Sequence, residues 1–457
     1  MVIGNRKNLC NGGIVFMKMR GITSILLASS LCVSMLAGCS GNSGSSSQAT
    51  DGGTSAASKA DQKTTLTWAM WDKDKVEYYQ QLADAYQKKN PNVTIAFKDL
   101  GSTDYQTALG TQLAGGDSGI DIVSVKDIPG YASMTKAGEL LDLTQYISDS
   151  KIDTNQYGDV VNQIKVDGKI YELPYRNDIW VVYYNKDLFD KAKVSYPTND
   201  MTFTQYDQLA RKVTSGSGND KVYGCYYHKW RSTVQLLGVL DGKHTIIDGD
   251  YSFLKPYYTT VLKEQQDGIC MDYATAKTSN ASYSGLFENN KAAMINMGGW
   301  YLSTIMTDIK NGKSKCAHFG IVKYPHPDGV AAGTTLGTIT GLAVTVSTKN
   351  KAAACDFLKF VTGTDGQVVI AATGSFPAIQ NGATLQEITS MKGFPTDANS
   401  KMALITSKVY LEMALNANSA GIDKALQNSH DAIMSKSISI DDGIKQMNDN
   451  VMPLLSK

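Results

Sequence analysis

The 457-residue chain is poor in the residues that build metal and redox sites. It holds seven cysteines and five histidines, and no two cysteines have C-x-x-C spacing. The histidines are scattered, with no spacing that would place two of them on one metal ion. We therefore predict neither a metal site nor another cofactor.

Catalytic signatures and an excess of charge of one sign are lacking as well. Neither G-x-S-x-G nor H-E-x-x-H occurs, which argues against the hydrolases that carry those motifs. Lysine and arginine number 44, and aspartate and glutamate number 43. Residues 1–38 contain four of the basic residues and no acidic one, so the remainder has 40 basic and 43 acidic residues. This balance offers no basic surface for nucleic acid.

The amino terminus has the pattern of an export signal. Lys18 and Arg20 precede an apolar run, 22–37, which is too short and too often interrupted by serine to span a membrane comfortably. The run closes on Leu-Ala-Gly-Cys at 36–39. This sequence resembles the lipobox of bacterial lipoproteins, in which the cysteine, here Cys39, becomes the first residue and carries lipid.

A segment of low complexity follows this signal. Residues 40–60 are almost all Gly, Ser, Thr, Ala, Asn, Asp and Gln, a composition typical of a flexible tether. We predict a signal peptide at 1–38 and a lipidated tether at 39–61. No second stretch is apolar and long enough to span a bilayer, so the lipid is the expected anchor, on the extracellular face of the cell membrane.

The rest of the chain alternates strand and helix patterns, which favours an α/β fold. Strands are predicted at 64–70, 93–97, 120–125, 180–184, 292–297 and 341–346. Helices are predicted at 76–86, 105–114, 351–361, 423–435 and 440–451. Asp74 and Glu77 have the spacing of a capping box at the first helix. Four cysteines lie in this region, Cys225, Cys270, Cys316 and Cys355, and they allow three pairings or none.

Several motifs occur in a particular order. They are AYQKKNPNV at 85–93, LAGG at 113–116 before IDIV at 120–123, GELLDLT at 138–144, VDGKIYELPY at 166–175, YYNKDLF at 183–189, and FENNKAAM at 287–294 with GGW at 298–300. In this order the chain resembles extracellular solute-binding proteins of ABC importers, the family that includes maltose-binding and multiple-sugar-binding lipoproteins.

The resemblance implies a two-lobed, periplasmic-binding-protein-like fold with hinge crossovers and a ligand cleft. The first lobe would comprise 62–176 and 334–373, and the second 177–333 and 374–457. A monomer would capture a carbohydrate, an oligosaccharide by our expectation, and deliver it to the permease subunits of an ABC transporter and their ATPase. The chain would not be an enzyme.

A sugar needs flat aromatic faces for its C–H surfaces and carboxylates or amides for its hydroxyls. Trp68 and Trp180 fall within strands and are assigned to the core. The resemblance places ligand contacts after strand ends and at the first crossover. The predicted contacts are Trp71, Asp72, Asp127, Asp178, Trp230 and Trp300, with Arg176, Tyr226 and Tyr301 as second-rank contacts.

Two alternative functions remain open from the sequence. A secreted glycoside hydrolase would need two carboxylates roughly 5–10 Å apart, which the predicted aspartates could supply. A binding protein for another solute, such as a polyamine, would also use acidic and aromatic side chains.

Overall fold

The computed structural model describes residues 63–116, 118–158 and 160–455. The predicted signal peptide, Cys39 and the tether lie outside these residues. Within the described part of the chain, no helix combines the length and apolarity needed to cross a membrane.

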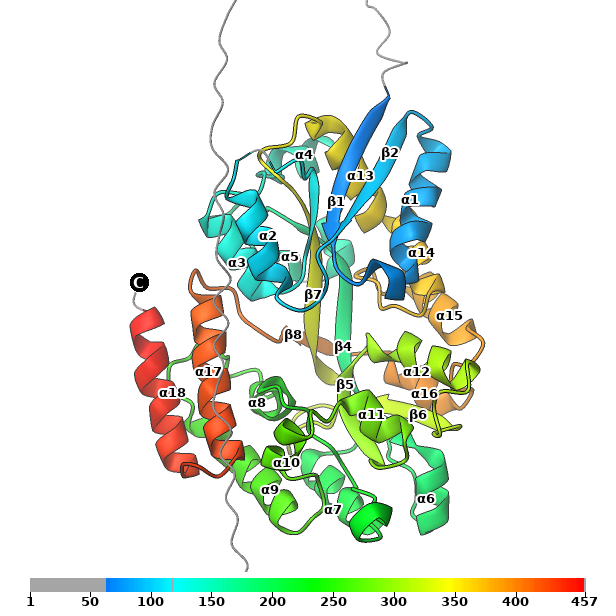
Figure 1. The fold of residues 1–457 in the computed structure, drawn as a ribbon, viewed down its shortest axis with the longest axis vertical. Helices are drawn as coiled ribbons and strands as arrows, with labels where there is room; N and C mark the ends of the chain where they lie inside the picture. The colour runs from blue at the N-terminus through cyan, green and yellow to red at the C-terminus, as the bar shows by residue number, and fades with distance from the viewer. Residues whose placement is uncertain (1–62, 117, 159, 456–457) are drawn as a thin grey trace, which may run out of the picture. The chain divides into compact units, whose positions relative to one another are not determined.

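The strands of the described region form one connected arrangement (Figure 1). They are β1 (Thr64–Met70), β2 (Val93–Asp99), β3 (Ile122–Val125), β4 (Leu173–Asn185), β5 (Met294–Gly298), β6 (Phe319–Lys323), β7 (Thr334–Val344) and β8 (Lys408–Leu411). Neighbours follow the order β2-β1-β3-β7-β4-β5, with β6 added to β4 and β8 to β7. β1 is parallel to β2 and β3, whereas β7 is antiparallel to β3 and β4.

Strand β4 joins two groups of strands. Its first part, 173–179, pairs with β7, and its second part, 180–185, pairs with β5 and β6. All of its residues are buried, including the polar run 176–178. The predicted lobe boundary at 176/177 therefore falls inside one continuous strand.

Trp68 anchors the core of the first strand group. Its side chain is fully buried, and its ring lies edge-on to Tyr79 and Phe357 at centroid distances of 5.1 and 5.3 Å. The indole N–H donates a hydrogen bond to Ser124 Oγ at 2.9 Å, so the one polar atom of the ring is satisfied. The prediction that Trp68 belongs to the core is confirmed, and so is that for Trp180, which is 1% exposed.

Helices cover both strand groups. The larger ones are α1 (Glu77–Lys89), α2 (Tyr105–Leu113), α3 (Ile128–Lys136), α7 (Phe203–Val213), α8 (Ser232–Val239), α9 (Lys255–Gln266), α12 (Tyr301–Lys310), α13 (Lys351–Thr362), α14 (Thr364–Ala372), α15 (Gly382–Ser390), α17 (Ser419–Met434) and α18 (Ile440–Leu455). The shorter ones are α4 (Thr144–Asp149), α5 (Val160–Gln163), α6 (Lys186–Ala192), α10 (Tyr273–Thr278), α11 (Tyr283–Glu288) and α16 (Ala398–Ala403). The 3₁₀ turns are η2 (Lys73–Lys75), η3 (Thr154–Tyr157), η4 (Gly218–Asp220) and η5 (Ser252–Leu254).

The predicted capping box at the first helix is wrong. Asp74 lies inside the 3₁₀ turn η2, and the N-cap of α1 is Val76, which offers no side-chain cap. Asp72 in the left-handed conformation, φ 51°, begins that turn and separates the strand from the helix. A capping box does form at α7, where Thr202 and Gln205 bond reciprocally.

Candidate ligand-binding site

Trp71 and Asp72 follow the carboxyl end of β1. The ring of Trp71 is half-buried and lies edge-on to Tyr105 at 4.9 Å, and Lys126 Nζ stands 5.6 Å from its centroid. Asp72 makes an ion pair with Lys75 at 3.1 Å, and its side chain remains partly accessible. Both side chains thus have surface to offer a ligand, as predicted for the end of a parallel strand.

Asp127 follows the neighbouring strand, β3, and caps helix α3. Its Oδ1 accepts the backbone N–H of Gly130 at 2.8 Å and the amide of Gln106 at 3.4 Å. Burial raises the pKa of this carboxyl, although the bond from Gly130 and the charge of Lys126 oppose that shift. The side chain is nonetheless only half-buried by accessible surface. A group that is surrounded by protein and still accessible suits the edge of a binding site.

Arg176 and Asp178 form an ion pair within strand β4. They are 8% and 2% exposed, and Arg176 Nη1 also donates to the hydroxyl of Tyr78 at 3.1 Å. Burial raises the pKa of Asp178, opposed by the adjacent guanidinium. Asp178 Oδ1 and Arg176 Nε are buried without a hydrogen-bond partner among the described residues. In this arrangement the pair lies in the β4–β7 interior, and a ligand could reach it only if the surrounding chain moved.

Trp230 and Trp300 form an aromatic group on the second strand group. Trp230 is 39% exposed and Trp300 is half-buried, with ring centroids 6.2 Å apart. His228 and Tyr283 flank Trp230 at 4.4 and 5.9 Å, and Trp180 lies edge-on to Trp300 at 5.6 Å. Two large rings with accessible faces and fixed supports can stack against an apolar ligand face.

Tyr226 and Tyr301 are core residues in this structure. Each is 1% exposed and belongs to the hydrophobic cluster beneath β5. The Tyr301 hydroxyl donates to Glu288 Oε1 at 2.9 Å, and that of Tyr226 donates to the carbonyl of Ala281 at 3.3 Å. Neither side chain has free surface for the second-rank ligand contact that was predicted.

Three charged residues that the sequence did not single out lie near Trp180 and the backbone after Trp230. Glu412 accepts hydrogen bonds from Thr338 and, at 3.4 Å, from the Trp180 indole. Burial raises the pKa of this carboxyl, and the bond from Thr338 and the charge of Arg231 oppose the shift. Arg231 is 4% exposed and donates through Nε to Asp423 Oδ1 at 2.6 Å.

No local pattern marks Glu412 or Asp423. Glu412 directly follows the four-residue strand β8, and Asp423 lies on helix α17, 192 residues after Arg231. Only Arg231 had a signal, as the direct neighbour of the predicted contact Trp230. Convergence of distant segments, rather than spacing along the chain, assembles these three.

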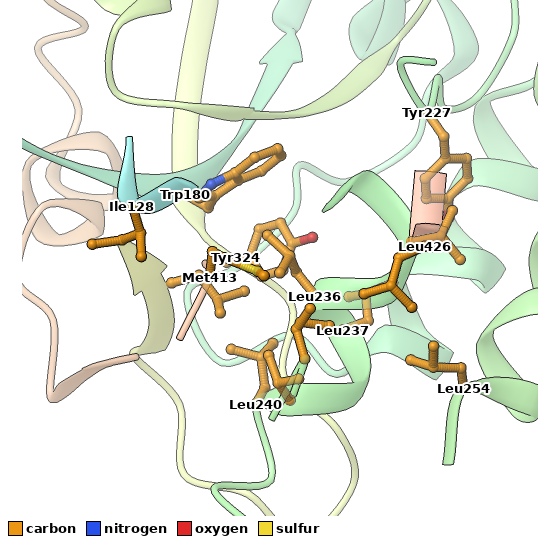
Figure 2. Packing of buried hydrophobic residues seen from close by; sticks show 14 of the residues in the cluster. Ile128, Trp180, Tyr227, Leu236, Leu237, Leu240, Leu254, Tyr324, Met413 and Leu426 are labelled. Carbon is orange, nitrogen blue, oxygen red and sulfur yellow. The ribbon is translucent and has the colours of Figure 1, made fainter. Parts of the chain in front are cut away.

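Helices α3 and α17 are in contact. This contact links the segment of Asp127 in the first strand group to the segments that follow β8. Asp127 lies close enough to Asp423 for the negative charge of Asp423 to raise the pKa of Asp127. Lys136 Nζ donates to Asn418 Oδ1 at 3.3 Å across the same contact. Figure 2 shows Ile128, the neighbour of Asp127, in one hydrophobic cluster with Trp180 and Met413. Lys126 thus lies by Trp71 and next to Asp127, and Asp423 pairs with Arg231, the neighbour of Trp230. The two groups are linked by the effect of the Asp423 charge on Asp127.

One cavity borders this region, and a second lies away from it. One of about 250 Å³ lies between Gln163 of α5 and the segment Tyr410–Leu411, just before Glu412. The other, about 260 Å³, surrounds Asp121 at the opposite ends of β1 and β3. Asp121 is already bonded to Thr67 N at 2.8 Å and to the Thr348 hydroxyl. The first cavity is therefore the better candidate for an extension of the site.

The chemistry of the group suits an uncharged or weakly cationic polar ligand. Aromatic faces and carboxylates converge, and Lys75, Lys126 and Arg231 are basic groups beside the carboxylates. Among the described residues, no three His, Cys, Asp or Glu side chains approach closely enough to hold a metal ion.

Comparison with known proteins gives a consistent picture. The model of the family described as bacterial extracellular solute-binding protein matches residues 72–368. A putative binding protein of Brucella abortus is 22% identical over 318 residues, which is 67% of this chain and 73% of that protein.

Two solved structures extend the similarity to most of the described chain. A sugar transporter from Rhizobium etli in an open conformation is 53% identical and has a TM-score of 0.78, covering 85% of this chain and 99% of its own. An ABC substrate-binding protein from Listeria monocytogenes in complex with cycloalternan is 21% identical, with a TM-score of 0.74 and coverage of 86% and 99%. The predicted two-lobed α/β fold class is confirmed. The family is one of binding proteins, not of enzymes, and this chain belongs to it as a bacterial extracellular solute-binding protein.

Proposed function

We propose that the protein captures a carbohydrate, most readily an oligosaccharide, and delivers it to the permease of an ABC importer. The observation that carries the proposal is the pair of partly exposed rings, Trp230 and Trp300, whose centroids are 6.2 Å apart. The partly exposed carboxylate of Glu412 accepts a hydrogen bond from Trp180, the ring that supports Trp300. Aromatic faces cover the C–H surfaces of a sugar ring, and charged groups bind its hydroxyls more strongly than neutral groups do. The Rhizobium etli relative is a sugar transporter, and the Listeria protein is in complex with a cyclic oligosaccharide.

The ligand would be held between two lobes, 62–176 with 334–373 and 177–333 with 374–457. In support, Trp71, Asp72 and Asp127 belong to the first of these and Trp230, Trp300 and Glu412 to the second. A ligand that contacts both binds the closed arrangement better and shifts the population toward it. A smaller radius of gyration with saturating ligand, measured by X-ray scattering, is the expected sign of closure.

The protein would work as a monomer anchored by lipid at Cys39, close to its permease. The lipobox-like sequence and the low-complexity segment after it support this proposal.

The decisive experiment is a thermal-shift screen of the purified protein against mono- and oligosaccharides, followed by calorimetry. A ligand at a hundred times its dissociation constant stabilises the folded state by about 2.7 kcal/mol, a readily measured shift. The screen should include polyamines, because Asp127, Asp423 and Glu412 concentrate negative charge at the site. A polyamine that shifts the melting temperature while every saccharide fails would overturn the sugar proposal.

A further inference from the structure

The four cysteines of the described region are all buried thiols, and they fall into separate parts of the interior. Cys355 packs in the cluster around Trp68, and Cys316 packs in the cluster beneath β5. Cys225 and Cys270 share a third cluster. Of the pairings that the sequence leaves open among these four, the structure brings together only this one.

The backbones around these two residues run side by side. The N–H of Gly224 donates to the carbonyl of Ile269 at 2.9 Å, and the N–H of Cys225 approaches the same oxygen at 3.5 Å. The Cys225 and Cys270 thiols lie close enough for each to influence the pKa of the other. Cys225 is 0% and Cys270 is 2% exposed. The two cysteine side chains therefore lie close together in a position closed to solvent.

The surroundings of Cys225 and Cys270 disfavour oxidation of the two thiols in the folded state. Glu264 Oε1 lies 3.6 Å from Cys225 Sγ, and burial, with Asp207 nearby, raises the pKa of Glu264 to about 8. Burial also raises the pKa of both thiols. Thiolate is the reactive form in disulfide exchange, so a folded, reduced protein should oxidise slowly.

We propose that Cys225 and Cys270 form a disulfide when the chain folds in an oxidising medium, with a small-molecule disulfide as oxidant. One protein thiolate attacks the oxidant, forms a mixed disulfide and releases one small thiol. The second protein thiolate then attacks the mixed disulfide and releases the other small thiol. Two protein thiols are oxidised, one small disulfide is reduced to two thiols, and the two protons pass to those thiols. Proteins outside the cell meet such conditions.

The bond would close the loop 225–270, which carries α8, α9 and the site residues Trp230 and Arg231. A cross-link restricts the unfolded chain and so raises stability. It would also link the backbone just before Trp230 covalently to the segment that follows α9. The folded protein would then keep whichever redox state it acquired while folding.

The test begins with full-length protein unfolded in denaturant with a reductant. One sample is refolded with oxidised glutathione and another with dithiothreitol. Free thiols are alkylated under denaturing conditions, and non-reduced tryptic peptides are analysed by mass spectrometry. We expect peptides 222–229 and 264–277, which hold one cysteine each, to be joined with the loss of two hydrogens in the first sample only.

Matched variants give a second readout. The wild type should melt several degrees higher after oxidative than after reductive refolding, and Cys316→Ala/Cys355→Ala should keep this difference. Cys225→Ala/Cys270→Ala should lose it. Two free thiols after oxidative refolding, or a link from either cysteine to Cys316 or Cys355, would overturn the proposal. The wild-type peptide measurement decides the question even where a variant fails to fold.

Discussion

Gly298 lies directly beneath the ring of Trp300: a Cβ placed at Gly298 would come 2.1 Å from Cζ3 of the indole. Gly298 also stands opposite Trp180 in the β4–β5 register. The glycine thus leaves the space in which the Trp300 ring rests, supported edge-on by Trp180. The position of the proposed ligand platform depends on the absence of a single methyl group.

Gly298→Ala should therefore displace the Trp300 ring. We expect weaker ligand binding and a loss of stability of about 1–3 kcal/mol, the usual cost of overpacking. Calorimetry and thermal melting measure the two effects. Gly110→Ala is the matched control, because nothing lies within 4 Å of its Cβ position and the residue is in helix α2, where alanine is favoured. Equal behaviour of the two variants would contradict the support assigned to Gly298.

Trp300→Ala should lower affinity tenfold to a hundredfold, because stacking of a large ring contributes roughly 1–3 kcal/mol. Its melting temperature should stay near that of the wild type, since the side chain is only partly buried. Trp68→Ala is the contrast: a fully buried tryptophan should cost about 3–5 kcal/mol of stability. If Trp300→Ala binds normally but melts far lower, Trp300 belongs to the core.

Glu412→Gln keeps the shape of the side chain and removes its charge. We expect a loss of affinity of tenfold or more, because hydrogen bonds to charged groups contribute about 1.5–3 kcal/mol. Glu387→Gln, at an exposed position on α15, should leave binding unchanged. Unaltered calorimetric affinity in the Glu412 variant would remove this residue from the proposed site.

Glu264 should make stability depend on pH. Its pKa is raised from 4.5 to about 8 by burial, so the folded state holds a proton that the unfolded state releases. The resulting contribution is complete below pH 4.5 and is lost as pH rises through 8, at up to about 1.4 kcal/mol per pH unit. Urea unfolding between pH 5 and 9 should show this decline in the wild type and a flatter profile in Glu264→Gln. Parallel profiles would mean that Glu264 is ionised in the folded protein.

Cys39→Ala tests the anchor. The lipobox interpretation predicts that the variant is released into the medium or stalls before cleavage, because the lipid acceptor is gone. Fractionation with an antibody against the mature protein distinguishes these fates from anchoring. A variant that stays on the membrane after cleavage at the same position would show that the anchor lies elsewhere.

Local patterns predicted much of the fold. The strand at 64–70 and the helix at 105–114 match β1 and α2 closely, because each has a clear periodicity and a clear end. By contrast, only 180–184 was predicted for β4, whose full length is Leu173–Asn185. Its first part is a strand because β7 pairs with it, and such long-range pairing leaves no period in the local sequence.

The candidate site also combines residues placed by local sequence with residues placed by long-range packing. The position of Trp71 and Asp127 after strand ends could be predicted from their place in the chain, and their contact with a ligand stays a prediction. Tyr301 could not be judged, because its burial depends on the packing of α12 over β5 and on the carboxylate of Glu288. Glu412 and Asp423 reach Arg231 only through the return of the chain after β8, which no short motif records.

The uninterrupted course of β4 limits how the protein can deform. Thirteen residues of strand span roughly 43 Å at about 3.3 Å per residue, and a hydrogen-bonded strand hardly stretches. Its first part, 173–179, pairs with the antiparallel β7, with a register shift between Pro174 and Arg176, and the two strands form a ribbon between the two strand groups. Such a ribbon yields to torsion and flexure far more easily than to extension. Relative movement of its ends should therefore be mainly rotational, with the two groups turning about the ribbon while their separation along it stays constant.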